Sequence, residues 1–169
     1  IGSSQEHYLT EIKSVIENAT FTYVRQRKML GLGHAILISE PLIGNQPFAV
    51  HLADDLCVTE GDNLLTKLTL LYKKFKCSII AIEEVSIDQT EKYGIIAGDL
   101  INGTNDCYHV NDMVEKPKSK DAPTNMAIIG RYILTPDIFD ILRKTIPDSS
   151  GEIQLTDALL EQAKKGKVI

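Results

Sequence analysis

The sequence predicts an α/β fold with a mixed, mostly parallel sheet flanked by helices. In the first half of the chain, apolar runs of strand length alternate with segments whose apolar residues recur at helical spacing. This alternation is typical of parallel sheets that carry helices on both faces. In the second half, strand-like segments follow one another with only turn residues between them, which predicts a mixed or antiparallel addition. We expect one domain over residues 1–169, because a domain takes about 100–200 residues.

The first elements are a helix and a short strand. Apolar residues recur at helical spacing over residues 6–18, and Phe21–Val24 is predicted as a strand. A second helix begins near Gly33 and has to end near Pro41, because proline interrupts the hydrogen bonds of a helix interior. The apolar run Pro47–Leu52 has the length of a buried strand.

A strongly amphipathic helix follows, capped by Asp62 or its neighbour, and it leads into a buried strand at Ser78–Ile82. Three more strand-like segments are separated by turn residues: Tyr93–Ala97, Cys107–Val114 and Ala127–Leu134. Two helices complete the chain, one after Pro136 and the other from about Gln154.

Composition excludes several classes of protein. A hydrophobic content of 43% and a charged content of 24% are those of a globular protein and not of a disordered or fibrous chain. The net charge of −5 repels nucleic acid and anionic membranes, so we expect neither as a partner. Three widely spaced cysteines predict neither a disulfide framework nor a zinc site, which suits a reducing cytoplasm. No apolar run is long enough to span a bilayer.

Two adjacent carboxylates, Asp54 and Asp55, come directly after an apolar strand. Ligands of α/β sheets bind at the carboxyl ends of strands, and a carboxylate pair there suits a hard cation such as Mg²⁺ over a polyphosphate. Taken alone, the pair is more typical of turn or helix-capping aspartates.

Other segments have both a functional and a structural interpretation. The glycines of Gly31–Gly33 allow backbone amides to approach a ligand, or they form a plain turn into a helix. Glu115 and Lys116 can hold a sugar hydroxyl and a phosphate, or form a surface ion pair. Arg131 can simply pair with an acidic neighbour, and Glu152 is favoured near a helix start whether or not it binds a ligand. No motif indicates a covalent nucleophile.

Six segments appear in order along the chain: Val24–Gln26 with Gly31–Ala35, Leu52–Asp55, Tyr93–Gly94, Val114–Pro117, Asn125–Tyr132 and Gly151–Ala158. Together they resemble the bacterial UTP–glucose-1-phosphate uridylyltransferases, a family of sugar nucleotidyltransferases also called UDP-glucose pyrophosphorylases. The resemblance covers nearly everything after residue 20. It implies a nucleotide-diphospho-sugar transferase fold of Rossmann-like type, and an enzyme that forms UDP-glucose and pyrophosphate from UTP and glucose 1-phosphate.

The resemblance also implies roles for residues that would hold the nucleotide, the metal and the phosphate. Gln26 corresponds to the residue that reads the uracil edge, with the backbone of Gly31 beside the base. Asp54 corresponds to a Mg²⁺-binding aspartate, and Lys116 to the lysine that holds the sugar phosphate. Asp54 and Lys116 are therefore the predicted catalytic residues.

Four further residues would hold the sugar. Gly94 resembles the glycine that lets the backbone approach the glucose ring, and Glu115 and Asn125 resemble partners of its hydroxyl groups. Glu152 resembles an acidic residue near the sugar.

Some parts of the family pattern are missing. The G-x-G-T-R phosphate loop does not occur, and neither does the Y-D-x-G string that carries a second metal-binding aspartate. We therefore expect a fold that is incomplete at both ends, and we expect these 169 residues alone not to turn over. The family also implies a homodimer or homotetramer.

Three other functions remain open on the sequence. One is a thymidylyl enzyme of the same fold, and another is a non-catalytic module that binds sugar nucleotides. The third is a receiver-type or flavodoxin-like domain, which leaves Glu115–Pro117 and the Glu152 segment unexplained.

Overall fold

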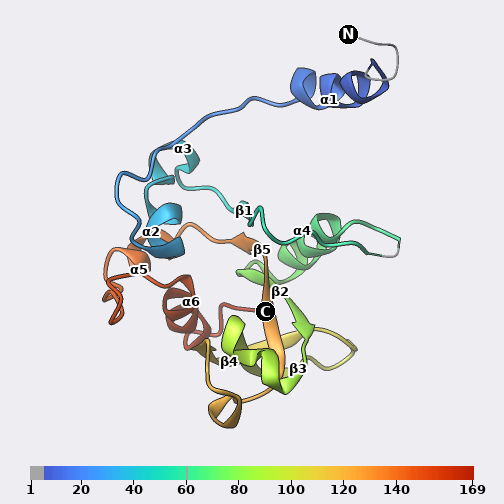
Figure 1. Ribbon diagram of the computed structural model, residues 1–169. Helices are drawn as coiled ribbons and strands as arrows, with labels where there is room; N and C mark the ends of the chain where they lie inside the picture. Colours follow the sequence, from blue (N-terminus) through green and yellow to red (C-terminus); the bar gives the residue numbers. More distant parts are fainter. Residues whose placement is uncertain (1–5, 60) are drawn as a thin grey trace.

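The computed structural model describes residues 6–59 and 61–169. A five-stranded sheet forms the centre of the molecule (Figure 1). Its strands are β1 (Phe48–His51), β2 (Ile79–Glu84), β3 (Gly94–Leu100), β4 (Tyr108–Glu115) and β5 (Met126–Leu134). All five strands predicted between residues 47 and 134 are therefore present.

The expectation of a mostly parallel sheet is wrong, because every pair of named strands is antiparallel. The helix α4 (Leu64–Phe75) does connect β1 to β2, and the two strands point the same way. They are not neighbours, however, because β5 lies between them and runs antiparallel to both. The β-α-β order therefore predicts correctly that β1 and β2 point the same way. It does not indicate that β5, which comes later in the chain, lies between them.

Strand β5 is the centre of the sheet. One of its edges pairs with β2 along nearly its whole length, from Ile79 opposite Ile133 to Glu84 opposite Met126. The other edge is shared by β1, opposite residues 131–134, and by β3, opposite residues 126–127. Strand β3 then diverges to pair with β4. The point where β1 and β3 separate along β5 is where the cleft described below opens.

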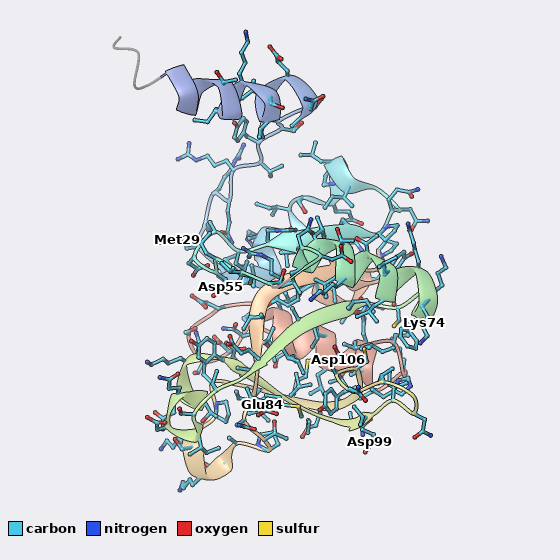
Figure 2. All side chains as sticks on the ribbon, turned by 90° about the vertical axis from the view of Figure 1, so that its right-hand side faces the viewer. Met29, Asp55, Lys74, Glu84, Asp99 and Asp106 are labelled. Carbon is cyan, nitrogen blue, oxygen red and sulfur yellow. The ribbon has the colours of Figure 1, made fainter. Side chains whose placement is uncertain are left out.

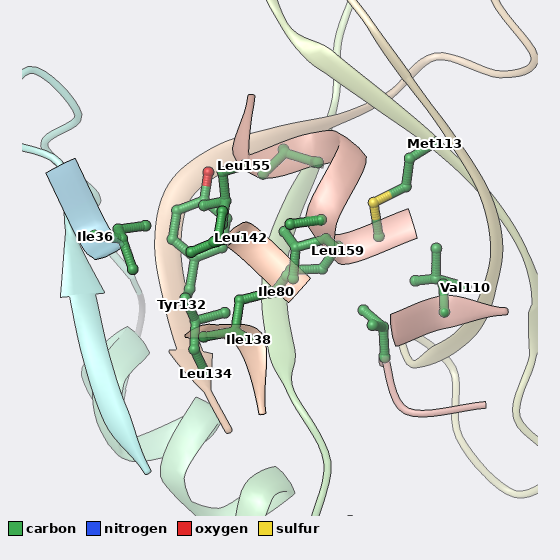
Figure 3. Packing of buried hydrophobic residues seen from close by; sticks show 14 of the residues in the cluster. Ile36, Ile80, Val110, Met113, Tyr132, Leu134, Ile138, Leu142, Leu155 and Leu159 are labelled. Atoms are coloured by element: carbon green, nitrogen blue, oxygen red, sulfur yellow. The ribbon is translucent and has the colours of Figure 1, made fainter. Parts of the chain in front are cut away.

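Helices cover both faces of the sheet, as predicted. On one face lie α2 (Gly31–Leu37), α5 (Ile138–Leu142) and α6 (Leu155–Ala163), whose apolar residues pack on the sheet (Figure 3). This larger core includes Ile36, Ile80, Tyr132, Leu134, Leu142 and Leu159. On the other face α4 packs through Leu68 against Ile79, Ala81 and Ile133. The short helices are α3 (Glu40–Ile43), η1 (Ile87–Lys92) and η2 (Ser119–Asp121).

The cap of α4 follows the prediction that Asp62 or its neighbour begins this helix. Asn63 is the cap, since its side-chain Oδ1 accepts a hydrogen bond of 2.9 Å from the Thr66 N–H. Such a cap satisfies one of the unpaired donors of the first turn. The helix ends at Lys76, which takes a left-handed conformation with φ 56°.

Helix α1 (Glu6–Asn18) forms as predicted and stands apart from the sheet (Figure 1). The predicted strand at Phe21–Val24 is wrong: this segment has no regular structure, and Tyr23 is 88% exposed. A strand needs a partner edge for its backbone hydrogen bonds. None of the described strands pairs with this segment. No helix among the described residues is long and apolar enough to cross a membrane.

A buried polar network fixes α6 against the sheet. Ser78 and Gln162 are both fully buried, and the Ser78 hydroxyl donates to Gln162 Oε1 at 2.9 Å. Gln162 Nε2 donates to Thr135 Oγ1 at 3.1 Å, and the Thr135 N–H donates to Ser78 Oγ at 3.1 Å. Because buried polar groups are costly unless paired, this closed set holds α6 in one position. That position places the first turn of α6 at the cleft.

Candidate active site

A cleft of about 310 Å³ opens beside β5. It collects residues from six separate parts of the chain: α2 (Leu32), the loop after β1 (Leu52, Asp54, Asp55), the start of β3 (Lys92, Tyr93, Gly94), the end of β4 (Glu115, Lys116), β5 (Ile128, Gly130, Tyr132) and the entry to α6 (Glu152, Gln154, Leu155, Thr156). The β5 residues are alternate ones, because alternate side chains of a strand share one face.

Five of the predicted site residues line this cleft together: Asp54, Gly94, Glu115, Lys116 and Glu152. They are separated by up to 98 positions in the sequence, so only the fold brings them together. Gln26, Gly31 and Asn125 lie outside the lining.

The loop that carries Asp54 is fixed on β5 by Arg131. The Leu52 N–H donates to the Gly130 carbonyl oxygen at 2.9 Å, and Arg131 Nη1 donates to the Leu52 carbonyl oxygen at 2.7 Å. Arg131 Nη2 also donates to the carbonyl oxygen of Asp55. The guanidinium thus holds the backbone on both sides of Asp54 (the position of Asp55 is labelled in Figure 2). The alternative that Arg131 pairs with an acidic side chain is wrong, since its described partners are carbonyl oxygens.

Glu115 and Lys116 both line the cleft although they are consecutive. Neighbouring residues of a regular strand point to opposite faces. Lys116 leaves the strand with φ 45°, a left-handed conformation, and its N–H donates to the Tyr93 carbonyl oxygen at 3.0 Å. Its Nζ consequently lies 3.7 Å from Glu115 Oε1. The Lys116 side chain is 60% exposed, so its ammonium remains available to a ligand.

Gly94 faces this pair across the start of β3. A Cβ added to Gly94 would lie 3.1 Å from Ile128 Cδ1, 3.1 Å from Thr156 Oγ1 and 3.2 Å from Glu115 Oε2. A side chain here would therefore intrude on the Glu115 carboxylate. The same carboxylate accepts a hydrogen bond of 2.5 Å from the Thr156 hydroxyl, so α6 fixes one of its oxygens and leaves the other toward Lys116.

Gln26 and Gly31 adjoin the cleft through Glu152. Gln26 Nε2 donates to the Gly31 carbonyl oxygen at 3.1 Å and lies 2.9 Å from His34 Nδ1. Gly31 has φ 85°, and a Cβ there would lie 2.9 Å from Glu152 Cβ. The Ile153 N–H donates to the Leu30 carbonyl oxygen at 2.8 Å. The two segments are thus joined side by side at one end of the cleft.

Asn125 is placed differently from the other predicted residues. Its Nδ2 donates to the Val85 carbonyl oxygen at 3.2 Å, and its own carbonyl oxygen accepts from the Val85 N–H at 3.0 Å. These bonds tie the entry of β5 to the end of β2. Its role toward a sugar stays a prediction.

Asp148 organises the turn before α6. Hydrogen bonds from the Ser150 hydroxyl, from Gln154 and from the Glu152 N–H hold the pKa of Asp148 well below its usual range. Gln154 Nε2 also donates to Glu152 Oε2 at 3.3 Å. The turn therefore fixes both the backbone and the carboxylate of Glu152. Desolvation and the charges of Glu115 and Asp148 raise the pKa of Asp157, a further sign that negative charge gathers here.

The cleft carries oxygen donors of the kind that a divalent cation prefers. Among the described residues, no three His, Cys, Asp or Glu side chains form a metal site. Asp54 and Asp55 supply carboxylate oxygens at the edge of the cleft. Magnesium is usually bound through one or two carboxylates, several waters and the phosphates of a substrate. The residues present fit a Mg²⁺ ion that arrives with a nucleotide.

The sequence patterns did not indicate roles for Tyr132 and Thr156, which line the cleft, or for Arg131, which holds the loop after β1. Arg131 and Tyr132 are part of the family segment Asn125–Tyr132, and Thr156 lies in Gly151–Ala158. The family strings marked them, but no local signal showed that Arg131 holds a loop 79 positions earlier or that Thr156 bonds Glu115.

A cleft with a carboxylate pair, and with a lysine beside a carboxylate, has the groups that suit a metal ion and a phosphorylated ligand. The sequence model of the nucleotidyl transferase family matches residues 3–169. The chain therefore belongs to the nucleotidyl transferase family.

Comparison with individual proteins confirms the narrower resemblance. The chain is 56% identical over 169 residues to a UTP–glucose-1-phosphate uridylyltransferase of Pseudomonas aeruginosa, which covers 99% of this chain and 60% of that relative. It is 40% identical over 157 residues to the UTP–glucose-1-phosphate uridylyltransferase YngB of Bacillus subtilis, covering 93% of this chain and 52% of the relative. The chain thus spans between half and two thirds of the length of these curated relatives.

Solved structures agree with this assignment of the fold. A UDP-glucose pyrophosphorylase complexed with UDP-glucose superposes with a TM-score of 0.91 at 53% identity, over 98% of this chain and 62% of that one. A UTP-bound enzyme from Acinetobacter baumannii gives a TM-score of 0.76 at 29% identity, over 99% of this chain and 61% of that one. The nucleotide-diphospho-sugar transferase fold is therefore confirmed.

Proposed function

We propose that the protein that carries these residues forms UDP-glucose and pyrophosphate from UTP and glucose 1-phosphate. The observation that supports this most directly is the convergence of Asp54, Glu115, Lys116 and Glu152 on one cleft. It occurs in a chain 56% identical to a UTP–glucose-1-phosphate uridylyltransferase.

The reaction would be an in-line attack by a phosphate oxygen of glucose 1-phosphate on the α-phosphorus of UTP. Both reactants are polyanions, so alignment and charge neutralisation supply most of the rate enhancement. Lys116 would hold the sugar phosphate with its exposed ammonium, and Asp54 would hold Mg²⁺, which neutralises charge on the phosphates. No side chain has to act as a nucleophile.

The sugar would lie against Gly94, between Glu115 and Glu152. Carboxylates accept hydrogen bonds from sugar hydroxyls, and Gly94 leaves the space that a side chain would fill. Gln26 would read the uracil through its amide oxygen, which can accept a hydrogen bond from the uracil N–H. In the structure that amide already bonds Gly31 and His34, which aligns it beside the Glu152 end of the cleft.

The proposed reaction also implies a cofactor, a cellular location and small-molecule partners. We infer Mg²⁺ as the cofactor, a cytoplasmic location in a bacterium, a role in carbohydrate metabolism, and UTP, glucose 1-phosphate, UDP-glucose and pyrophosphate as the small-molecule partners. A homodimer or homotetramer is the expected assembly, and we expect no nucleic-acid or membrane partner.

The test is to measure pyrophosphate release by the complete protein that carries these residues, with glucose 1-phosphate, Mg²⁺ and either UTP or dTTP. We expect turnover that prefers UTP and is lost on removal of Mg²⁺ or in Asp54→Ala. A preference for dTTP would instead indicate the thymidylyl enzyme. Saturable binding of UDP-glucose over dTDP-glucose without turnover would indicate a non-catalytic binding module.

A further inference from the structure

Tyr132 has an unused hydroxyl inside the cleft. Its side chain is only 6% exposed, and its ring packs among core residues while the oxygen points toward Leu155, another lining residue (Figure 3). Among the described residues, every fully buried side-chain oxygen or nitrogen has a hydrogen-bond partner. The Tyr132 hydroxyl has no partner among them, so it is not fully buried. The hydroxyl is therefore open to the cleft and to whatever occupies it.

The surroundings keep this hydroxyl protonated. Burial, together with the negative charges of Glu115, Asp55 and Asp54, raises the pKa of Tyr132 far above its usual value of 10.0. A phenol in this position donates a hydrogen bond at any physiological pH.

Four polar residues of the cleft lining are carboxylates, and Lys92 and Lys116 are its cationic donors. Asp54, Asp55, Glu115 and Glu152 are carboxylates, which accept hydrogen bonds when ionised. A sugar hydroxyl carries one donor and two acceptor positions, so carboxylates alone leave its acceptor positions unmatched. Tyr132 supplies a neutral donor on the floor formed by β5, close to the carboxylates that would accept from the same sugar.

We propose that Tyr132 is a sugar-binding residue, whose hydroxyl donates a hydrogen bond to an uncharged oxygen of the glucose moiety. This inference rests on the proposed function, because it takes UDP-glucose as the ligand. An uncharged acceptor is favoured over a phosphate oxygen, since Asp54, Asp55 and Glu115 line the same cleft and their negative charge repels an anion there.

The test compares Tyr132→Phe with the wild-type complete protein by calorimetric titration with UDP-glucose and with UDP, both in the presence of Mg²⁺. The substitution keeps the ring in the core and removes only the hydroxyl. A neutral hydrogen bond corresponds to about a two- to tenfold change in affinity. We expect that loss for UDP-glucose and unchanged affinity for UDP.

Tyr72→Phe serves as the matched control, because Tyr72 packs on the opposite face of the sheet. It should leave both affinities and the melting temperature unchanged. Equal affinities of Tyr132→Phe and wild type for UDP-glucose would overturn the inference. Equal losses for UDP and UDP-glucose would also overturn it, because they would assign the bond to the UDP part of the ligand. Failure of the wild-type protein to bind UDP-glucose would refute the proposed function itself.

Discussion

Gly130 is the position on β5 where the loop that carries Asp54 rests, so alanine at this position tests how strictly the loop must be placed. A Cβ at Gly130 would lie 2.8 Å from Leu52 Cβ and closer still to Asp55 Oδ2. The Asp55 carboxylate can swing aside, because it is the end of a side chain. Leu52 Cβ is attached directly to the backbone, so the loop itself has to move.

The size of the movement follows from the contact distance. Ordinary contacts of a Cβ begin at 3.4 Å, so the Leu52 backbone has to retreat by about 0.6 Å, a displacement at the limit of what a catalytic constellation tolerates. A misplacement of about 1 Å can lower a rate by about 100-fold. We expect Gly130→Ala to lower kcat/KM for UDP-glucose formation by about 10- to 100-fold. The crowding should destabilise the fold by about 1–3 kcal/mol.

The assay is steady-state pyrophosphate release by the complete protein at saturating Mg²⁺, with the free energy of unfolding measured in urea. Gly103→Ala is the control, since Gly103 has φ 81° and nothing within 4 Å of an added Cβ. Alanine there strains the backbone by about 1 kcal/mol but lies outside the cleft. The control should therefore lose stability and keep its rate.

Wild-type rates in a folded Gly130→Ala protein would refute the reasoning, because the loop could then shift without consequence for the reaction. Equal rate losses in Gly130→Ala and Gly103→Ala would refute it in another way. In that case general instability, and not the position of Asp54, would account for the effect.

Three further changes test other parts of the cleft. Arg131→Lys cannot bond the Leu52 and Asp55 carbonyl oxygens with two nitrogens, and it should raise the Mg²⁺ concentration for half-maximal rate by about tenfold. Arg143→Lys, on the surface, is the control. An unchanged Mg²⁺ titration of Arg131→Lys would contradict the prediction. Thr156→Val removes the donor to Glu115 and should cost about 1 kcal/mol in urea unfolding, with a several-fold higher KM for glucose 1-phosphate but not for UTP. Above pH 10.0 the unfolded protein releases the Tyr132 proton while the folded protein retains it. The wild type should therefore lose about 1.4 kcal/mol of stability per pH unit more than Tyr132→Phe, measured by urea unfolding at pH 9 and pH 11. Equal changes in the unfolding free energy of the two proteins would show that the pKa of Tyr132 is not raised.

Local elements were predictable because their signals are local. The helical spacing before Phe75, the cap near residue 62 and the turn residues between β3, β4 and β5 all lie within a few positions of the structure that they specify. The order of strands was not predictable in this way. Strand β5 enters between β1 and β2 although it lies more than forty positions after both, and periodicity within a segment does not indicate its neighbours.

The candidate site shows the same division. Asp54 after its strand and Glu115 beside Lys116 are visible as sequence patterns, and the family strings placed them in order. The bond from Thr156 to Glu115 joins residues 41 positions apart, and that from Arg131 to Leu52 joins residues 79 apart. Asn125 differs from these residues. Its family segment predicts a contact with the sugar, whereas its side chain donates to the Val85 carbonyl oxygen at the end of β2.

The acidity of the cleft follows from the partners of Arg131. A guanidinium this close to two aspartates would ordinarily form ion pairs with them and neutralise their charge. Here its donors are used on carbonyl oxygens of Leu52, Gly130 and Asp55, so it fixes the loop and leaves both carboxylates without an ion pair among the described residues. On the proposed function, a cation from solution would balance this charge together with Lys92 and Lys116 when a triphosphate approaches. We therefore expect a metal–nucleotide complex to bind more tightly than the free nucleotide, and we expect replacement of Arg131 to change that preference as well as the loop.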